Sequence, residues 1–369
     1  MHVSVLRSAP IFLPLAYLWL RLLNALRPEW STNPQYSYGW VVPVLCIGLV
    51  IRRWHDARSS ESEPDSLPVV SWSLVIFCAG LALLYLPSRL IEEATPEWRP
   101  VEWALAIITI GLTFCLIYWS RGGSWIRVSG FPIAFLFVAI PWPSLIEIPL
   151  IQGLTRASSA TVVEVLDALG VPAMRHGNLL EVATGTVGID EACSGIRSFQ
   201  SSLMISLFLG EFYRLSVRRR VLLVPVGFAL AFAFNVCRSS ILTWIAAAKG
   251  PAAIASYHDE AGVAILVACT FTMWGVAATL KSRRFQVPTL TSQVPSPKFQ
   301  VPSFKSTVSS PRSTVRGPQS TVRALSVGLL VWVVTVEVGV AGWYRIRESH
   351  IRPGPAWTVE FPKQNPTFR

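Results

Sequence analysis

The sequence predicts an all-α protein that crosses a membrane many times. Of its 369 residues, 52% are hydrophobic and only 14% are charged, whereas soluble domains have about 25% charged residues. Its fifteen tryptophans are typical of membrane proteins, where indole rings concentrate at the lipid–water interface. The net charge of +11 comes from basic residues at the ends of apolar runs, without the basic and aromatic alternation of a nucleic-acid interface. We therefore expect membrane lipid as a partner and no nucleic acid.

Nine apolar runs are candidates for spanning helices, each of which needs about twenty mainly apolar residues. They cover residues 11–26, 40–51, 72–86, 101–119, 131–150, 198–212, 221–247, 261–280 and 324–344. The first eight form a core, and the ninth is an extra C-terminal helix. The first run contains Arg21 and lacks a small-residue cleavage site, so we expect it to be retained rather than removed as a signal peptide.

Basic residues predict the orientation of these helices. Four connections are rich in arginine or lysine, at residues 52–58, 121–127, 214–220 and 281–284. With nine spans and the N-terminus inside, all four face the cytoplasm, as the positive-inside rule expects. The loops that then face outward are residues 28–39, 87–100, 151–197 and 249–260.

The long outer connection is predicted to contain structure of its own. Residues 152–169 are amphipathic, with Val162, Val165, Leu166 and Leu169 at helical spacing. We expect a helix that lies on or re-enters the outer face, with a true span as the alternative. The short β-type runs at residues 179–182 and 186–189 predict a small extracytoplasmic hairpin that covers the outer side of the next helix.

Composition divides the chain into three regions. Residues 1–284 form the multi-span core. Residues 285–323 repeat QVP and STV motifs and are rich in serine, proline, lysine and arginine, which predicts a disordered cytoplasmic linker. Residues 324–369 then supply the extra transmembrane helix and a short extracytoplasmic tail.

One cysteine stands apart from the other five. The chain has no CxxC pair and no Cys/His cluster with zinc spacing, so we expect no metal site and no cofactor. Five cysteines lie within apolar runs, but Cys193 lies in the polar stretch DEACSGIRS. A thiol at a helix N-terminus beside Arg197 ionises readily, and the thiolate is a nucleophile. Alternatively, Cys193 packs as a small hydrophobe while Asp190 and Glu191 only favour the helix start.

Three further polar residues are candidates for the same site. Arg238 lies within the apolar run 221–247, where a charge costs about 2.5–3.5 kcal/mol. It is a functional-site candidate, with a buried ion pair or snorkelling as the alternative. Asn235 lies one helical turn before it, and His258 lies in the short outer loop before the run 261–280.

The predicted topology brings these candidates to one side of the membrane. Cys193 enters its helix from outside, Arg238 lies six to nine residues, or about 10 Å, below the outer end of its helix, and His258 lies on the outer rim. A thiol, an imidazole and a guanidinium supply a nucleophile, a general base or acid, and an anion stabiliser.

Several motifs resemble those of the exosortase/archaeosortase family of membrane cysteine transpeptidases. They are EACSGIR at residues 191–197, NVCR at 235–238, His258, WSTNPQYSYG at 30–39, the FPxxFL and PxP elements at 131–136 and 141–143, and GN at 177–178. The resemblance covers roughly residues 13–280. Many members have histidine where this chain has Tyr38, so no catalytic role is carried to that position.

The resemblance implies a membrane-embedded cysteine protease or transpeptidase of the cytoplasmic membrane. It would cleave secreted proteins that end in a PEP-CTERM-type sorting motif, a spanning helix and a basic tail, at the outer membrane face, through a thioacyl intermediate. Cys193 would be the nucleophile, His258 the general base and acid, and Arg238 the oxyanion stabiliser. Asn235, Glu191 and Arg197 would orient them. Such enzymes often accompany exopolysaccharide production.

Two alternatives come from other functional classes. A transporter or channel would use Arg238 to bind an anionic substrate, although the two halves show no convincing repeat. A non-catalytic subunit of an exopolysaccharide export system would need no thiol chemistry. Whether Cys193 is required for function distinguishes both alternatives from the enzyme.

Overall fold

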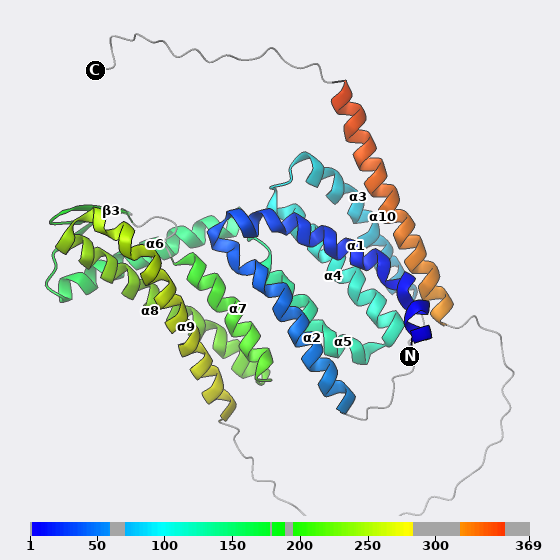
Figure 1. Cartoon of the computed structure of the whole chain (residues 1–369), viewed down its shortest axis with the longest axis horizontal. Coiled ribbons are helices and arrows are strands. Elements are labelled where there is room, and N and C mark those ends of the chain that lie inside the picture. The colour runs from blue at the N-terminus through cyan, green and yellow to red at the C-terminus, as the bar shows by residue number, and fades with distance from the viewer. Residues whose placement is uncertain (1, 60–70, 178, 189–194, 283–317, 351–369) are drawn as a thin grey trace, which may run out of the picture.

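The protein is a multi-pass, all-α membrane protein with one small sheet, as predicted (Figure 1). The computed structural model describes residues 2–59, 71–177, 179–188, 195–282 and 318–350. The elements are α1 (His2–Thr32), η1 (Pro34–Trp40), α2 (Val41–Ser59), α3 (Trp72–Ala94), α4 (Arg99–Arg121), α5 (Gly123–Ala134), η2 (Phe135–Ala139), α6 (Ser144–Ala168), β1 (Ala173–His176), β2 (Leu179–Val182), β3 (Gly185–Gly188), α7 (Ile196–Phe212), α8 (Val217–Lys249), η4 (Pro251–Ala253), α9 (Ile254–Ser282) and α10 (Pro318–Ser349).

The number of helices that qualify as spans is lower than the nine predicted. Among the described residues, six helices are long and apolar enough to cross a membrane, or seven if one bent pair counts as a single span. Helix α7 has only 17 residues, and α1 carries charged residues within its apolar stretch. Even so, α7 packs lengthwise against α8 and α9 in the bundle (Figure 1).

The predicted span at residues 131–150 is not one continuous helix. The chain is helical through α5 and η2, breaks at residues 140–143, and turns by 70° into α6. Pro141 and Pro143 explain the break, because proline has no N–H to donate and disfavours a helical residue before it. The predicted amphipathic helix at residues 152–169 is the second half of the 25-residue α6.

Side chains from distant elements satisfy the backbone at this break. The Trp30 indole N–H donates to the Ala139 carbonyl at 2.8 Å, and the Tyr38 hydroxyl donates to the Val138 carbonyl at 3.0 Å. The Trp103 indole donates to the Pro141 carbonyl at 2.8 Å. The Trp142 N–H donates to the Tyr36 hydroxyl at 2.8 Å. Irregular backbone within a membrane protein needs such internal partners, because lipid offers none.

This arrangement explains the WSTNPQYSYG sequence of residues 30–39. The predicted outer loop is instead the end of α1 and the 3-10 helix η1. Asn33 caps η1 by accepting from the Gln35 N–H at 3.0 Å. Gly39 lies directly against the Trp30 ring, where any side chain would overlap the indole. Residues 30–39 and the break at 140–143 therefore form one structural unit.

Two packed regions share the bundle. The larger hydrophobic core is formed by helices α1 through α5 together with η1, η2 and α10. A second core lies between α7, α8 and α9. Figure 1 shows the two regions side by side, with α6 and the sheet above the second.

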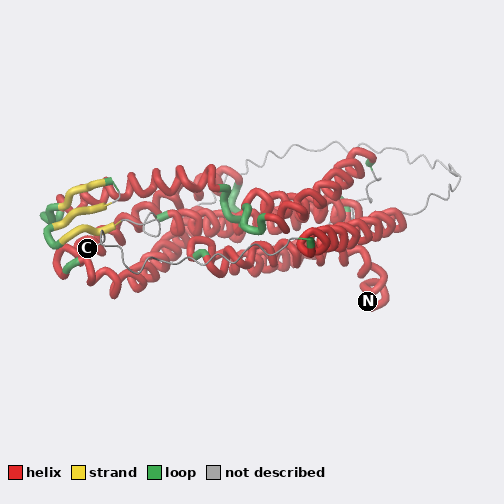
Figure 2. Tube along the Cα trace, turned by 90° about the horizontal axis from the view of Figure 1, so that it is seen from above, coloured by secondary structure: helices red, strands yellow, loops and turns green. Residues whose placement is uncertain are grey.

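The predicted hairpin is a three-stranded antiparallel sheet in the order β1-β2-β3. Residues 179–182 form β2 as expected, β3 begins one residue earlier than predicted, and β1 was not predicted. The buried side chains Leu180 and Val182 alternate along β2 and pack with Val162 of α6 and Val236 of α8. The sheet therefore packs on α6 and α8, rather than covering α7 as predicted, at the end of the molecule away from α3 and α10 (Figures 1 and 2).

The four basic connections meet at one end of the bundle. Arg53 donates to Glu211 at 2.5 Å and to the Arg127 carbonyl at 2.6 Å. Arg220 donates to the other Glu211 oxygen at 2.5 Å, and Arg219 donates to the Leu280 carbonyl at 2.6 Å. These contacts place the basic connections on a common side, as the predicted topology requires.

Helix α10 begins six residues before the predicted start of the last span and packs on α1, α3 and α4. Its Glu337 accepts from the Tyr85 hydroxyl at 2.5 Å and from Arg89 at 3.2 Å, and lies 3.8 Å from Arg21. The last helix is thus part of the N-terminal half of the bundle. Most of the predicted linker and the predicted tail lie outside the described residues.

Glu211 provides a test of the basic end. Its side chain is buried between Arg53 and Arg220, and removing one partner of a buried ion pair costs about 3 kcal/mol or more. We expect Glu211→Gln to lower the free energy of unfolding by that amount in a detergent–SDS titration. The exposed Glu164→Gln serves as the control and should leave the unfolding midpoint unchanged. Equal midpoints for the two variants would contradict the ion-pair assignment.

Candidate active site

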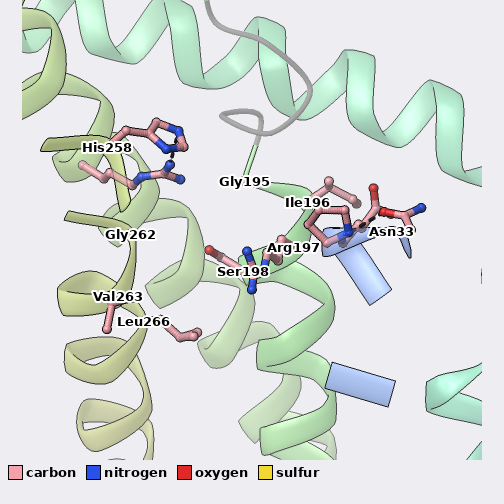
Figure 3. A pocket seen from close by; sticks show the side chains of 12 residues that line it. Asn33, Gly195, Ile196, Arg197, Ser198, His258, Gly262, Val263 and Leu266 are labelled. Carbon is pink, nitrogen blue, oxygen red and sulfur yellow. Dashed lines mark hydrogen bonds between the residues drawn. The ribbon is translucent and has the colours of Figure 1, made fainter. Parts of the chain in front are cut away.

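A pocket of about 560 Å³ lies between η1, the start of α7, α8 and α9 (Figure 3). The residues that line it are Asn33, Pro34, Gln35, Gly195, Ile196, Arg197, Ser198, Arg238, His258, Gly262, Val263 and Leu266. Its volume falls within the range of small-ligand sites, about 300–1,000 Å³. The pocket contains three of the six residues that the sequence singled out.

Arg238 and His258 are in direct contact in this pocket. Arg238 Nη2 lies 2.8 Å from His258 Nε2, the bond drawn as a dashed line beside His258 in Figure 3. A guanidinium only donates hydrogen bonds, so His258 Nε2 is the acceptor, and the proton of the neutral imidazole is on Nδ1. In this arrangement the Nε2 lone pair faces the Arg238 guanidinium.

His258 lies on a helix rather than in the predicted loop. The 3-10 turn η4 leads directly into α9 at Ile254, which makes His258 the fifth residue of α9. Pro251 begins η4, and a proline at the first position favours a helical start. A helical backbone holds the imidazole more firmly than a surface loop would.

Arg238 lies deeper than predicted. Helix α8 continues to Lys249, so Arg238 is eleven residues, or about 16 Å, from the end of the helix. The predicted depth of six to nine residues was too small by about one turn. His258 lies in α9, which packs beside α8. The pocket therefore extends to the depth of Arg238.

Gly195 connects the cysteine motif to this pocket. It is the N-cap of α7 with φ +87°, a conformation that favours glycine. A Cβ atom at this position would lie 2.8 Å from Asn235 Cγ. Asn235 is buried, and its Nδ2 donates to Ser158 Oγ of α6 at 3.3 Å. The Asn235 side chain therefore packs against the backbone at the start of α7, and only glycine fits at this position.

Cys193 and Glu191 lie outside the described residues. Cys193 precedes Gly195 by two positions in the sequence. Arg197 is exposed on the first turn of α7, and its Nη2 lies 3.4 Å from Ser37 Oγ of η1.

A buried polar network behind the pocket was not predicted. Glu147, at the start of α6, is 5% exposed; it accepts from the Tyr36 hydroxyl at 2.5 Å and also from Gln35 and Arg99. Gln200 of α7 donates to the Tyr36 hydroxyl at 3.2 Å. The network joins η1, one wall of the pocket, to α4, α6 and α7. In the sequence, Glu147 and Arg99 stand out only as charged residues near the edges of apolar runs.

The transmembrane exosortase family model (Exosortase_EpsH) matches residues 30–275, about two thirds of the chain. The chain belongs to the transmembrane exosortase family. This confirms the resemblance read from the motifs, and membership implies a PEP-CTERM sorting enzyme of a family generally considered cysteine transpeptidases. No curated protein and no solved structure matched the chain. The match begins at Trp30, before η1, and ends within α9, so it omits most of α1 and all of α10.

The contact between Gly195 and Asn235 gives a second prediction. We expect Gly195→Ala to destabilise the protein by about 1–3 kcal/mol, because alanine is strained at positive φ and its methyl group overlaps Asn235. The melting temperature in detergent should fall by several degrees. Gly153→Ala on α6, where no atom lies within 4 Å of the added methyl group, is the matched control. A Gly195→Ala protein as stable as this control would show that α7 does not rest on Asn235.

Proposed function

We propose that this exosortase is a cysteine transpeptidase whose active site is the pocket around Arg238 and His258. It cleaves C-terminal sorting signals of the PEP-CTERM type from secreted proteins, at the outer face of the cytoplasmic membrane. The observation that carries the proposal is the 2.8 Å contact between Arg238 and His258, in a pocket whose wall includes Gly195. Family membership supports the substrate class.

Chain connectivity supports Cys193 as the nucleophile. Cys193 precedes Gly195 by two residues in the sequence, and Gly195 lines the pocket. A thiol near an imidazole forms the nucleophile–base pair of covalent catalysis.

The first half-reaction forms a thioacyl enzyme. As the Arg238 guanidinium turns from His258 Nε2 to the substrate carbonyl, Nε2 takes the thiol proton. Cys193 Sγ attacks the scissile carbonyl carbon, so that an S–C bond forms and the carbonyl oxygen becomes an oxyanion. Arg238 donates to this oxyanion. Its Nε is buried without a hydrogen-bond partner among the described residues, which supports this role. The C–N bond then breaks, and the amine leaves with the proton held by His258.

The second half-reaction releases the substrate. A hydroxyl, an amine or water attacks the thioacyl carbon while His258 accepts its proton. The S–C bond breaks, and the proton returns to Cys193, so that atoms and charges balance over the cycle. Asn235 positions Gly195, and we assign an orienting role at the same site to Glu191, whereas Arg197 orients the substrate.

The distribution of charge supports an outward-facing site. The basic connections gather at one end of the bundle, where Arg53, Arg127, Arg219 and Arg220 make their contacts. Arg238 lies in the far half of α8, eighteen residues beyond Arg220. If the basic end faces the cytoplasm, the pocket faces outward.

A processing assay tests the proposal. The chain is co-expressed with a reporter that ends in a Pro-Glu-Pro motif, a spanning helix and a basic tail, and the size of the reporter is followed. We expect Cys193→Ala, His258→Ala and Arg238→Ala each to reduce the initial rate of processing at least a hundredfold, because each removes a group that acts on the reacting atoms.

The matched controls are Cys237→Ala and His176→Ala, which change an exposed thiol on α8 and an exposed imidazole on β1. Both should process the reporter at the wild-type rate. Processing that persists in Cys193→Ala at unchanged protein level would remove the enzyme assignment and leave Arg238 as part of a transport or structural site.

A further inference from the structure

The described wall of the pocket carries positive charge. Of the described residues that line it, the two that are permanently charged are both arginines, Arg197 and Arg238. The remaining lining is apolar or neutral, with Pro34, Ile196 and Leu266 among the apolar residues. Such a wall favours a substrate segment that combines apolar side chains with a carboxylate.

The two arginines differ in their partners. Arg238 lies 2.8 Å from His258, which places it beside the proposed general base. Arg197 is exposed, and its one described polar contact is the 3.4 Å approach to Ser37 Oγ, longer than an ordinary N–H···O bond of 2.7–3.2 Å. No described carboxylate forms an ion pair with it. By contrast, Arg99, in the buried polar network behind the pocket, is paired with Glu29 and Glu147.

The position of Arg197 fits recognition close to the reacting bond. It follows Gly195 by two residues on the first turn of α7. In Figure 3 it lies between His258 and Gly262 on one wall and Asn33 on the other. A planar guanidinium can donate two parallel N–H bonds to a carboxylate, and this geometry distinguishes a carboxylate from an amide or an ammonium group.

We propose that Arg197 is a specificity-determining residue that binds a carboxylate side chain of the substrate, in the segment next to the scissile bond. This deepens the proposed function and rests on it. Arg238 and His258 act on the reacting atoms, whereas Arg197 selects an acidic peptide and sets its register in the pocket.

Paired changes of enzyme and reporter test this assignment. Three reporters carry Glu, Gln or Lys at the central position of the Pro-Glu-Pro motif. For each reporter, kcat/KM is measured in detergent or membranes. The wild-type protein should prefer the Glu reporter over the Gln reporter by ten- to a hundredfold. In Arg197→Gln this preference should fall to about twofold, mainly through a higher KM for the Glu reporter. Arg197→Glu should process the Lys reporter faster than the Glu reporter.

Arg175→Gln is the matched control. Arg175 is an exposed arginine of β1 that donates to the Arg156 carbonyl at 3.1 Å and does not line the pocket. It should keep the wild-type preference.

An unchanged preference for Glu over Gln in Arg197→Gln would overturn the assignment. So would an Arg197→Glu protein that still prefers the Glu reporter. Neither result affects the proposed function, which fails separately if Cys193→Ala still processes the Glu reporter.

Discussion

The structure depends on how the chain satisfies its own backbone where the helix breaks between η2 and α6. A lipid environment offers no water to an open carbonyl or N–H group, so each of these groups must find a protein partner. Trp30, Tyr38 and Trp103 supply the donors, and the Tyr36 hydroxyl supplies the acceptor. These partners come from α1, η1 and α4, about forty to one hundred residues away in the sequence. The bend, and with it the direction of α6, is therefore determined by tertiary contacts.

The same contacts build one wall of the candidate active site. Tyr36 joins the break to Glu147 and, through Gln200, to α7, while its neighbours Pro34 and Gln35 line the pocket. On the opposite wall, α8 and α9 bring Arg238 to His258. Between the walls, α7 begins at Gly195 on top of Asn235. Two motifs that show no reactive chemistry, at residues 30–39 and 141–143, thus have a structural role, since they shape the pocket in which we propose that the chemistry occurs.

Much of this was predictable because it depends on local composition. Long apolar runs and clustered basic residues indicate a multi-span bundle and its common basic end. Arg238, singled out as a charge within an apolar run, lies in the pocket. What failed depends on pairing between distant residues. The buried Glu147 network joins residues more than one hundred positions apart, and its charges look like ordinary helix-end residues in the sequence. The helical setting of His258 was missed because a short segment beginning with Gly250 and Pro251 is typical of a loop.

Helix α10 has a consequence for how the protein is made. Glu337 meets Arg89 and Tyr85 of α3 and approaches Arg21 of α1, but it is synthesised after all of them. Until translation is nearly complete, Arg21 and Arg89 have Glu92 and Glu93 as their partners, but the Tyr85 hydroxyl lacks the Glu337 carboxylate to which it donates, and an unpaired buried polar group is costly. The polar contacts of the first half of the bundle are therefore complete only once the last helix has packed against it. A ribosome that stops before α10 releases a chain in which the Tyr85 hydroxyl has no Glu337 to accept its hydrogen bond.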